Sequence, residues 1–238
     1  MKKTKVIIPA LGLLLLSTAA SVTGTVAWFA ANTTVTANGM PVTAKSDSTF
    51  LLIKAGTATL DQIRTGKLTS DTAVNASAAL LPAAHNNTVT NITTADTVSN
   101  WYYKTSDDPS VYGGEGKESE PTALTAFTNY VLVNEFSLGI AAGGNSMSNL
   151  KVGNCTLTTA GDAAVKVLVA TSSAVEEFSA SGAGSTTLQA SLDTSSVMTV
   201  KVYIYWDGED ADVYTNGISD LQSTSVSLTF TGSVVQPA

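Results

Sequence analysis

The stretch that decides the fold is Val200-Lys201-Val202-Tyr203-Ile204-Tyr205-Trp206. Its aliphatic residues occupy every second position, 200, 202 and 204, while Lys201, Tyr203 and Tyr205 stand between them. Successive side chains of a β-strand point to opposite faces of the sheet, so the aliphatic residues share one face. The stretch therefore predicts a β-strand with one face in a hydrophobic core and an opposite face of tyrosine and lysine.

Similar short apolar segments recur along the chain and are separated by turn residues. The predicted strands are 49–54, 127–140, 150–158, 163–170, 198–206 and 225–231. Residues 60–68 have the spacing of one short helix, and no segment has the pattern of a long one. We predict an all-β fold, an antiparallel β-sandwich of the jelly-roll type, although the strand order cannot be derived.

The composition favours β-structure with uncharged polar surfaces. Hydrophobic residues make up 44% of the 238 residues and charged residues only 13%, against about 25% in ordinary soluble proteins. The net charge of −7 becomes −7 − 3 = −10 if an N-terminal segment carrying Lys2, Lys3 and Lys5 is removed. Such a chain is a poor partner for nucleic acid. Cys155 is the only cysteine, so no internal disulfide can form, and we expect it to be a small buried strand residue.

The first 27 residues have the organisation of a secretory signal peptide. The three lysines precede an apolar run from Val6 to Leu16, which is too short to span a bilayer, and small residues follow. Cleavage could follow Ala20 or Ala27, and we favour Ala27, which makes Trp28 the new N-terminus. Residues 28–238 then form a single β-sandwich domain that contacts the membrane only through the uncleaved signal. The alternative, an uncleaved anchor over 6–29, stays open.

The junction Gly24-Thr25-Val26-Ala27-Trp28-Phe29 resembles that of the TasA- and camelysin-like proteins of Gram-positive bacteria. These proteins are exported with a signal peptidase of the SipW type. Their third junction position is aromatic, whereas Val26 stands here. The resemblance implies cleavage between Ala27 and Trp28, a jelly-roll subunit, and a secreted or cell-surface location. It also implies that copies of the protein assemble into biofilm-matrix fibres.

In such a fibre, the resemblance implies that each subunit donates its N-terminal strand to a neighbour. A sheet edge presents unpaired backbone groups, which an extended segment from another chain can complete. Head-to-tail insertion does not close on itself, so it propagates as a filament. The expected assembly strand contains Trp28, Phe29, Thr33, Thr34, Val35, Thr36 and Ala37, and can extend to Ala44. The alternative is that 33–44 pairs within its own domain.

Residues 69–121 are rich in Ala, Thr, Asn and Ser and predict a loop-rich insertion. Within it, Trp101-Tyr102-Tyr103 is either an anchor in the core or an interface, or a platform on which a sugar stacks. The second reading gives an alternative function, a monomeric surface module that binds a glycan or a host protein through 69–121.

Catalytic motifs are missing from the sequence. His85 is the only histidine, which rules out the H-E-x-x-H zinc motif, and no G-x-S-x-G occurs. We expect His85 to be a solvated loop residue. We predict no cofactor and no enzymatic activity.

An acidic segment follows the strand that ends at Trp206. Its carboxylates are Asp207, Glu209, Asp210 and Asp212. Several oxygen ligands on one loop suit calcium, but the spacing is not that of an EF-hand. Asp and Gly also favour tight turns for backbone reasons, so we predict a solvated turn and keep calcium binding as the alternative.

Overall fold

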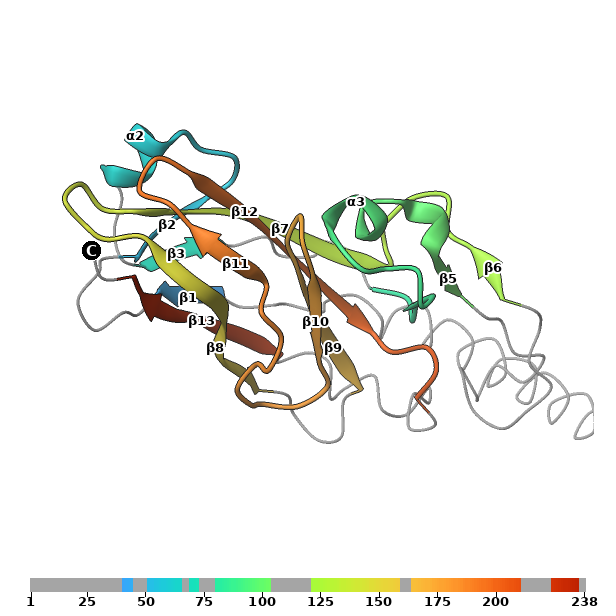
Figure 1. Cartoon of the computed structure of the whole chain (residues 1–238). Coiled ribbons are helices and arrows are strands. Elements are labelled where there is room, and N and C mark those ends of the chain that lie inside the picture. The colour runs from blue at the N-terminus through green and yellow to red at the C-terminus, as the bar shows by residue number, and fades with distance from the viewer. Residues whose placement is uncertain are drawn as a thin grey trace, which may run out of the picture.

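The computed structural model describes residues 40–44, 51–65, 69–72, 80–103, 121–158, 164–210 and 224–235. Two five-stranded sheets dominate these residues (Figure 1). The predicted all-β sandwich is confirmed, while the jelly-roll topology stays a prediction. None of the described helices has the length and apolar character needed to cross a membrane.

The first sheet has the strand order β11-β8-β13-β1-β3. Its strands are β11 (Gln189–Leu192), β8 (Met147–Thr158), β13 (Ser225–Val234), β1 (Met40–Ala44) and β3 (Thr69–Thr72). Its pairs are antiparallel except one: β1 runs parallel to β13, with Val42 opposite Leu228. The first strand of the described residues, β1, therefore lies inside this sheet, between β13 and β3.

The second sheet has the order β10-β9-β12-β7-β2, and every neighbouring pair is antiparallel. Its strands are β10 (Val175–Phe178), β9 (Val165–Ala170), β12 (Val197–Trp206), β7 (Val131–Ile140) and β2 (Leu51–Ala55). The strand predicted over 127–140 begins only at Val131. Residues 127–130 instead form a turn in which Asn129 has a positive φ of 71°.

The predicted alternation of side chains along β12 is confirmed, because its aliphatic residues and its tyrosines belong to different hydrophobic clusters. Val200, Val202 and Ile204 belong to the main hydrophobic core, together with residues of both sheets such as Leu228. Tyr203 belongs to a second cluster on the opposite side of the strand. The main core therefore fills the space between the two sheets, and the outer side of the second sheet is covered as well.

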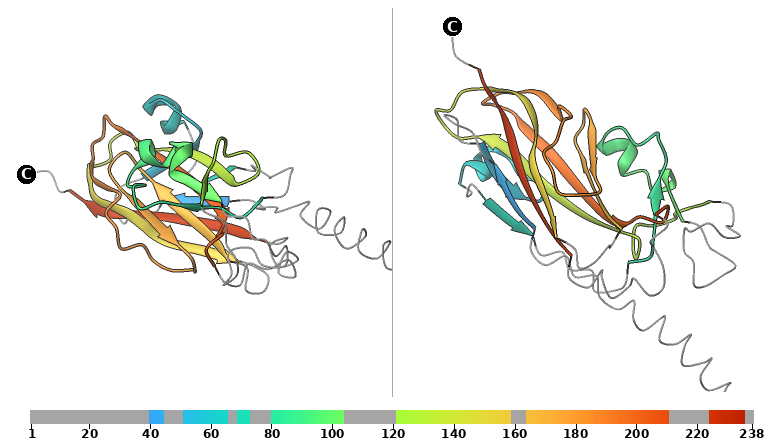
Figure 2. Two further views of the ribbon diagram at one scale, coloured as in Figure 1. Left: turned by 90° about the vertical axis from the view of Figure 1, so that its right-hand side faces the viewer. Right: turned by 90° about the horizontal axis from the view of Figure 1, so that it is seen from below.

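The cover is a small folded unit, here called the cap, formed by residues 80–103 and 121–130. It contains a three-stranded sheet of β4 (Ala84–His85), β5 (Trp101–Tyr103) and β6 (Thr122–Ala123), the helix α3 (Ile92–Ala95) and the 3-10 helix η1 (Val98–Asn100). Figures 1 and 2 show the cap at one end of the sandwich and α2 (Leu60–Arg64) toward the other. Most of the cap lies in the predicted insertion 69–121, but that region also supplies β3 of the first sheet.

Short capping motifs, rather than length, define the two α-helices of the described residues. In α2, the Thr59 side chain accepts from the backbone N–H of Gln62, and the Gln62 side chain accepts from that of Thr59. Asn91 and Thr94 form the same reciprocal pair in α3. Such capping boxes satisfy backbone donors that a helix start leaves unpaired. Helix α2 ends at Arg64, four residues before the predicted end.

Candidate functional site

The cap packs onto the outer face of the second sheet around one buried tryptophan. Trp101 is fully buried, and its indole N–H donates to the carbonyl of Ala95, 2.8 Å away. Its ring contacts Tyr203 and Tyr205 of β12 at centroid distances of 5.7 and 5.1 Å. Phe127 contacts the same ring from the other part of the cap, at 5.8 Å. Trp101 is thus the apolar centre of the junction between cap and sheet.

A first polar contact lies beside this aromatic centre. Lys201 of β12 places its Nζ 2.6 Å from Oδ2 of Asp96, the residue that caps the end of α3. The hydroxyl of Tyr203 donates to the other oxygen of Asp96, at 2.7 Å. Glu135 of β7 lies 3.7 Å from the same lysine. Two side chains of one strand therefore hold a single carboxylate of the cap.

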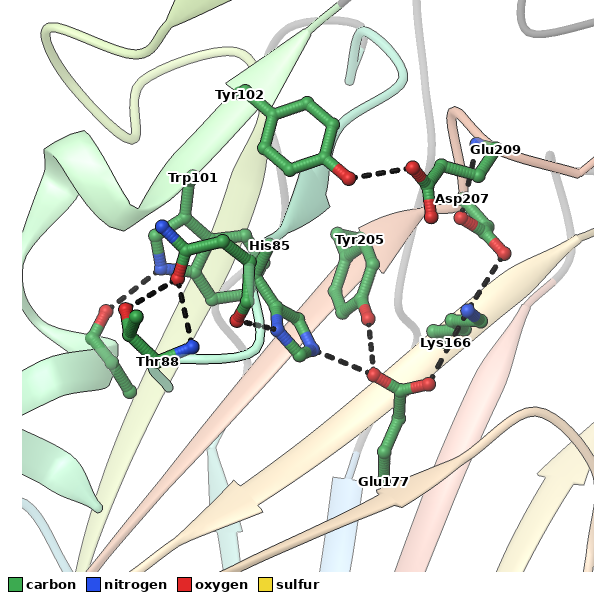
Figure 3. A network of polar contacts seen from close by, with 11 residues as sticks. His85, Thr88, Trp101, Tyr102, Lys166, Glu177, Tyr205, Asp207 and Glu209 are labelled. Atoms are coloured by element: carbon green, nitrogen blue, oxygen red, sulfur yellow. Dashed lines mark hydrogen bonds and ion pairs between the residues drawn. The ribbon is translucent and has the colours of Figure 1, made fainter. Parts of the chain in front are cut away.

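A second polar contact joins the cap to β10 (Figure 3). Nε2 of His85 on β4 lies 2.7 Å from Oε2 of Glu177, and Nδ1 lies 3.1 Å from the carbonyl oxygen of Asn86. Both neighbours are acceptors, so both ring nitrogens must donate, and the geometry selects the positively charged imidazolium. The hydroxyl of Tyr205 donates to the same Glu177 oxygen at 2.7 Å.

The pKa values of this pair agree with its geometry. Burial alone lowers the pKa of His85, but its contacts with Glu177 and the Asn86 carbonyl outweigh that effect and raise the pKa. Burial raises the pKa of Glu177, but hydrogen bonds from His85 and Tyr205 and the charge of Lys166 lower it to about 2. Burial and the neighbouring carboxylate raise the pKa of Tyr205, which stays a neutral donor. Both pKa directions therefore agree with the charged pair that the hydrogen-bond geometry selects.

The network continues to the end of β12 (Figure 3). Nζ of Lys166 on β9 lies 3.3 Å from Oε1 of Glu177 and 2.8 Å from Oδ2 of Asp207. The other Asp207 oxygen accepts from the backbone N–H of Glu209, at 3.1 Å. Glu209 in turn accepts a hydrogen bond from Tyr102 of the cap. The chain of contacts thus starts and ends on the cap and passes through β10, β9 and the turn that follows β12.

The contacts of His85 and Trp101 decide two predictions that the sequence made for the insertion 69–121. His85 was predicted to be a solvated loop residue, and this prediction is wrong: it lies on β4, pairs with Glu177 and packs edge-on against Trp101. Trp101 serves as a core anchor, so its ring is not available as a platform for a sugar. Tyr103, which is partly buried, stacks on Tyr130 at a centroid distance of 5.5 Å.

The acidic segment after β12 forms a turn in its described part. Asp207 is buried rather than solvated, and its carboxylate is held by Lys166 and by the backbone of Glu209. The backbone N–H of Asp210 donates to the carbonyl of Asp207 at 3.3 Å, which closes the turn. Asp212 lies outside the described residues. Within the described ranges, no group of three or more acidic, histidine or cysteine side chains is arranged to hold a metal ion.

The predicted signal peptide and cleavage site, and the assembly residues Trp28, Phe29, Thr33, Thr34, Val35, Thr36 and Ala37, lie outside the described residues. The segment that follows them is described. Met40–Ala44 is β1, and in the single chain it pairs in cis with β13 and β3, which is the alternative arrangement for this part of 33–44. Its register places Thr43 beside Thr229 and Ala44 beside Phe230.

Sequence reasoning missed the partners of the two strand lysines, although it placed Lys201 on the outer face. A lysine inside an otherwise apolar central strand, as in Val165-Lys166-Val167 and Val200-Lys201-Val202, is a usable signal, because a half-buried amine requires an acid nearby. It cannot say which acid. The partners Asp96 and Asp207 are 105 and 41 positions away, respectively (201 − 96 and 207 − 166).

Comparisons of the chain with protein-family models, with curated proteins and with solved structures give no match. The polar network ties the cap to the second sheet, and β1 lies between β13 and β3 of the first sheet.

Proposed function

We propose that this protein is an exported structural subunit that polymerises into an extracellular or cell-surface fibre by exchanging its N-terminal strand. In the fibre, β1 of one molecule occupies the position between β13 and β3 of the next. Residues Trp28–Ala37, which precede β1, extend the exchanged arm.

The orientation of β1 carries this proposal. It runs parallel to β13 and antiparallel to β3. It follows that β3 and β13 are antiparallel to each other and have the orientation of direct neighbours. β13 and β3 could therefore form an antiparallel pair with each other, and β1 is inserted between them.

The rest of the topology supports the same view. Without β1, the order β11-β8-β13-β3 faces the order β10-β9-β12-β7-β2. Two packed antiparallel sheets are the architecture of a jelly roll. From β7 onward, the chain changes sheet at every step except between β9 and β10. We infer a jelly roll into which β1 inserts.

Removing β1 from its position between β13 and β3 would cost considerable free energy of folding. The β13 residues beside it, Leu228 and Phe230, are fully buried, and removal of β1 would leave the backbone groups of β13 unpaired. A second copy supplies the same strand with the same register, so exchange of β1 itself is nearly neutral in free energy. The arm 28–37 supplies the added contacts that favour the neighbour, with Trp28 and Phe29 as anchors.

A cross-linking experiment distinguishes pairing in cis from pairing in trans. Thr43 and Thr229 are register partners on adjacent strands, a separation that a disulfide can bridge. Two variants, Thr43→Cys and Thr229→Cys, are mixed under conditions in which fibres form and are then oxidised. We expect disulfide-linked dimers that contain one copy of each variant. The chain that carries both substitutions is the matched control.

The outcome that refutes the proposal is equally specific. If mixed fibres give no linked dimers while the double variant links only within its own chain, then β1 stays in its own sheet. A second test deletes residues 28–37. We expect a folded monomer, since β1 remains present, and no fibres by electron microscopy. Fibres like those of the wild type would show that the arm supplies no anchoring contact.

A further inference from the structure

The buried carboxylate of Asp207 contacts the amine of Lys166, and the two groups are placed so that a covalent bond could form between them. Lys166 lies on β9 and Glu177 on β10, and Asp207 directly follows the last residue of β12. Nζ of Lys166 is 2.8 Å from Asp207 and 3.3 Å from Glu177. The exposed fraction of the Asp207 side chain is 7%, against 31% for Glu177.

We propose that Lys166 and Asp207 become joined by an intramolecular amide bond between Nζ and the side-chain carbonyl carbon. The ammonium and the carboxylate lose one molecule of water together. One N–C bond forms and one C–O bond breaks, and the departing oxygen takes two protons from the ammonium. The reaction needs no oxidant and no second substrate, and the ion pair and the amide have the same net charge.

The arrangement supplies what the condensation requires. The reacting form is a neutral amine beside a neutral carboxylic acid. An ammonium beside a carboxylate reaches this neutral form only rarely near neutral pH. Holding the two groups in contact compensates for this low population, because well-oriented intramolecular reactions have effective molarities of about 10⁵–10⁸ M relative to the same reaction between separate molecules. Glu177 holds the amine from its other side, and the Glu209 N–H holds the Asp207 carboxylate in place.

The contacts of Lys166 with Asp207 and Glu177 also limit the rate of amide formation. Burial lowers the pKa of Lys166, but the hydrogen bond and charge of Asp207 and the charge of Glu177 raise it on balance. The amine is therefore deprotonated rarely. We expect the bond to form slowly, over the lifetime of the folded protein rather than during folding.

A matched ion pair on the same sheet serves as an internal control. Lys201 and Asp96 lie 2.6 Å apart, but the Asp96 side chain is 37% exposed. Water that reaches Asp96 favours the separated ions over the amide. We expect the bond at Lys166 and none at Lys201.

The test is the intact mass of the aged full-length protein, followed by proteolysis and peptide mapping. We expect a mass one water below that of the sequence, and a branched peptide that joins Lys166 to Asp207. Lys166→Arg keeps the positive charge but cannot form the amide, so its full mass should be retained. Lys201→Arg should show the same loss of water as the wild type. Circular dichroism checks that both variants fold.

Two outcomes overturn the proposal. The first is a full mass for the aged wild-type protein. The second is a water loss that persists in Lys166→Arg, because cyclisation of Asp207 onto the Gly208 backbone nitrogen also removes one water. Since neither outcome depends on fibres, the result is independent of the proposed strand exchange.

Discussion

Replacement of Trp101 by alanine should release the cap while leaving the sandwich intact. The side chain is fully buried, contacts Tyr203, Tyr205 and Phe127, and donates to the carbonyl of Ala95. Truncation of a buried tryptophan to alanine costs about 3–5 kcal/mol. The cluster around Trp101 is separated from the main core by the second sheet, so this loss falls on the attachment of the cap.

Hydrogen exchange measured by mass spectrometry can locate the effect. A loss of about 3–5 kcal/mol corresponds to amide exchange faster by roughly two to four orders of magnitude. We expect this acceleration in α3 and β5, with β8 and β13 still protected as in the wild type. This pattern is local opening, in which one unit exchanges without global unfolding.

Phe136→Ala is the matched control. Phe136 is also fully buried, but it lies in the main core between the sheets. Its truncation should lower the protection of both sheets together. If Trp101→Ala also lowers protection in β8 and β13, or leaves the cap protected, then the cap does not open independently of the sandwich.

Three further predictions follow from other contacts. Gly184→Ala should destabilise the fold by about 1–3 kcal/mol in urea titrations, because an added Cβ would lie 2.3 Å from a Glu176 oxygen and 2.6 Å from a backbone carbonyl oxygen; an unchanged midpoint would contradict it. Cys155 should resist thiol reagents in the folded protein, since it is fully buried and burial raises its pKa to about 11; rapid labelling without denaturant would count against this. The ion pair of His85 and Glu177 should make cap attachment depend on pH at both ends. The raised pKa of His85 means that its contribution is complete below 6.5 and disappears as pH rises through the folded value, while the contribution of Glu177 is complete above 4.5 and disappears toward about 2. His85→Gln should remove the dependence at high pH, measured by cap exchange, and retention of that dependence would show that another group causes it.

The alternation of residues along β12 was enough to predict both the strand and its faces. A period of two reports which side chains share a face. It carries no information about what covers that face, and here the tyrosine and lysine side lies under a cap rather than in solvent.

The location of β1 could not be predicted for a different reason. A short extended segment pairs with whichever edge tertiary packing offers, and the register partner of Val42 lies almost at the other end of the chain. His85 was misjudged on the same ground, since Asn and Thr neighbours suggest a loop while its partner Glu177 is 92 positions away.

The placement of β1 also sets an order of events during synthesis. Val42 is synthesised well before its neighbour Leu228, since the two are separated by 228 − 42 = 186 positions. Contacts between such distant residues form slowly, because the intervening chain must first be brought together. The first sheet can therefore be completed only after the residues of β13 have been synthesised. Until then, the leading segment has no finished site to occupy in its own molecule, and a nascent chain cannot offer a complete site to a neighbour.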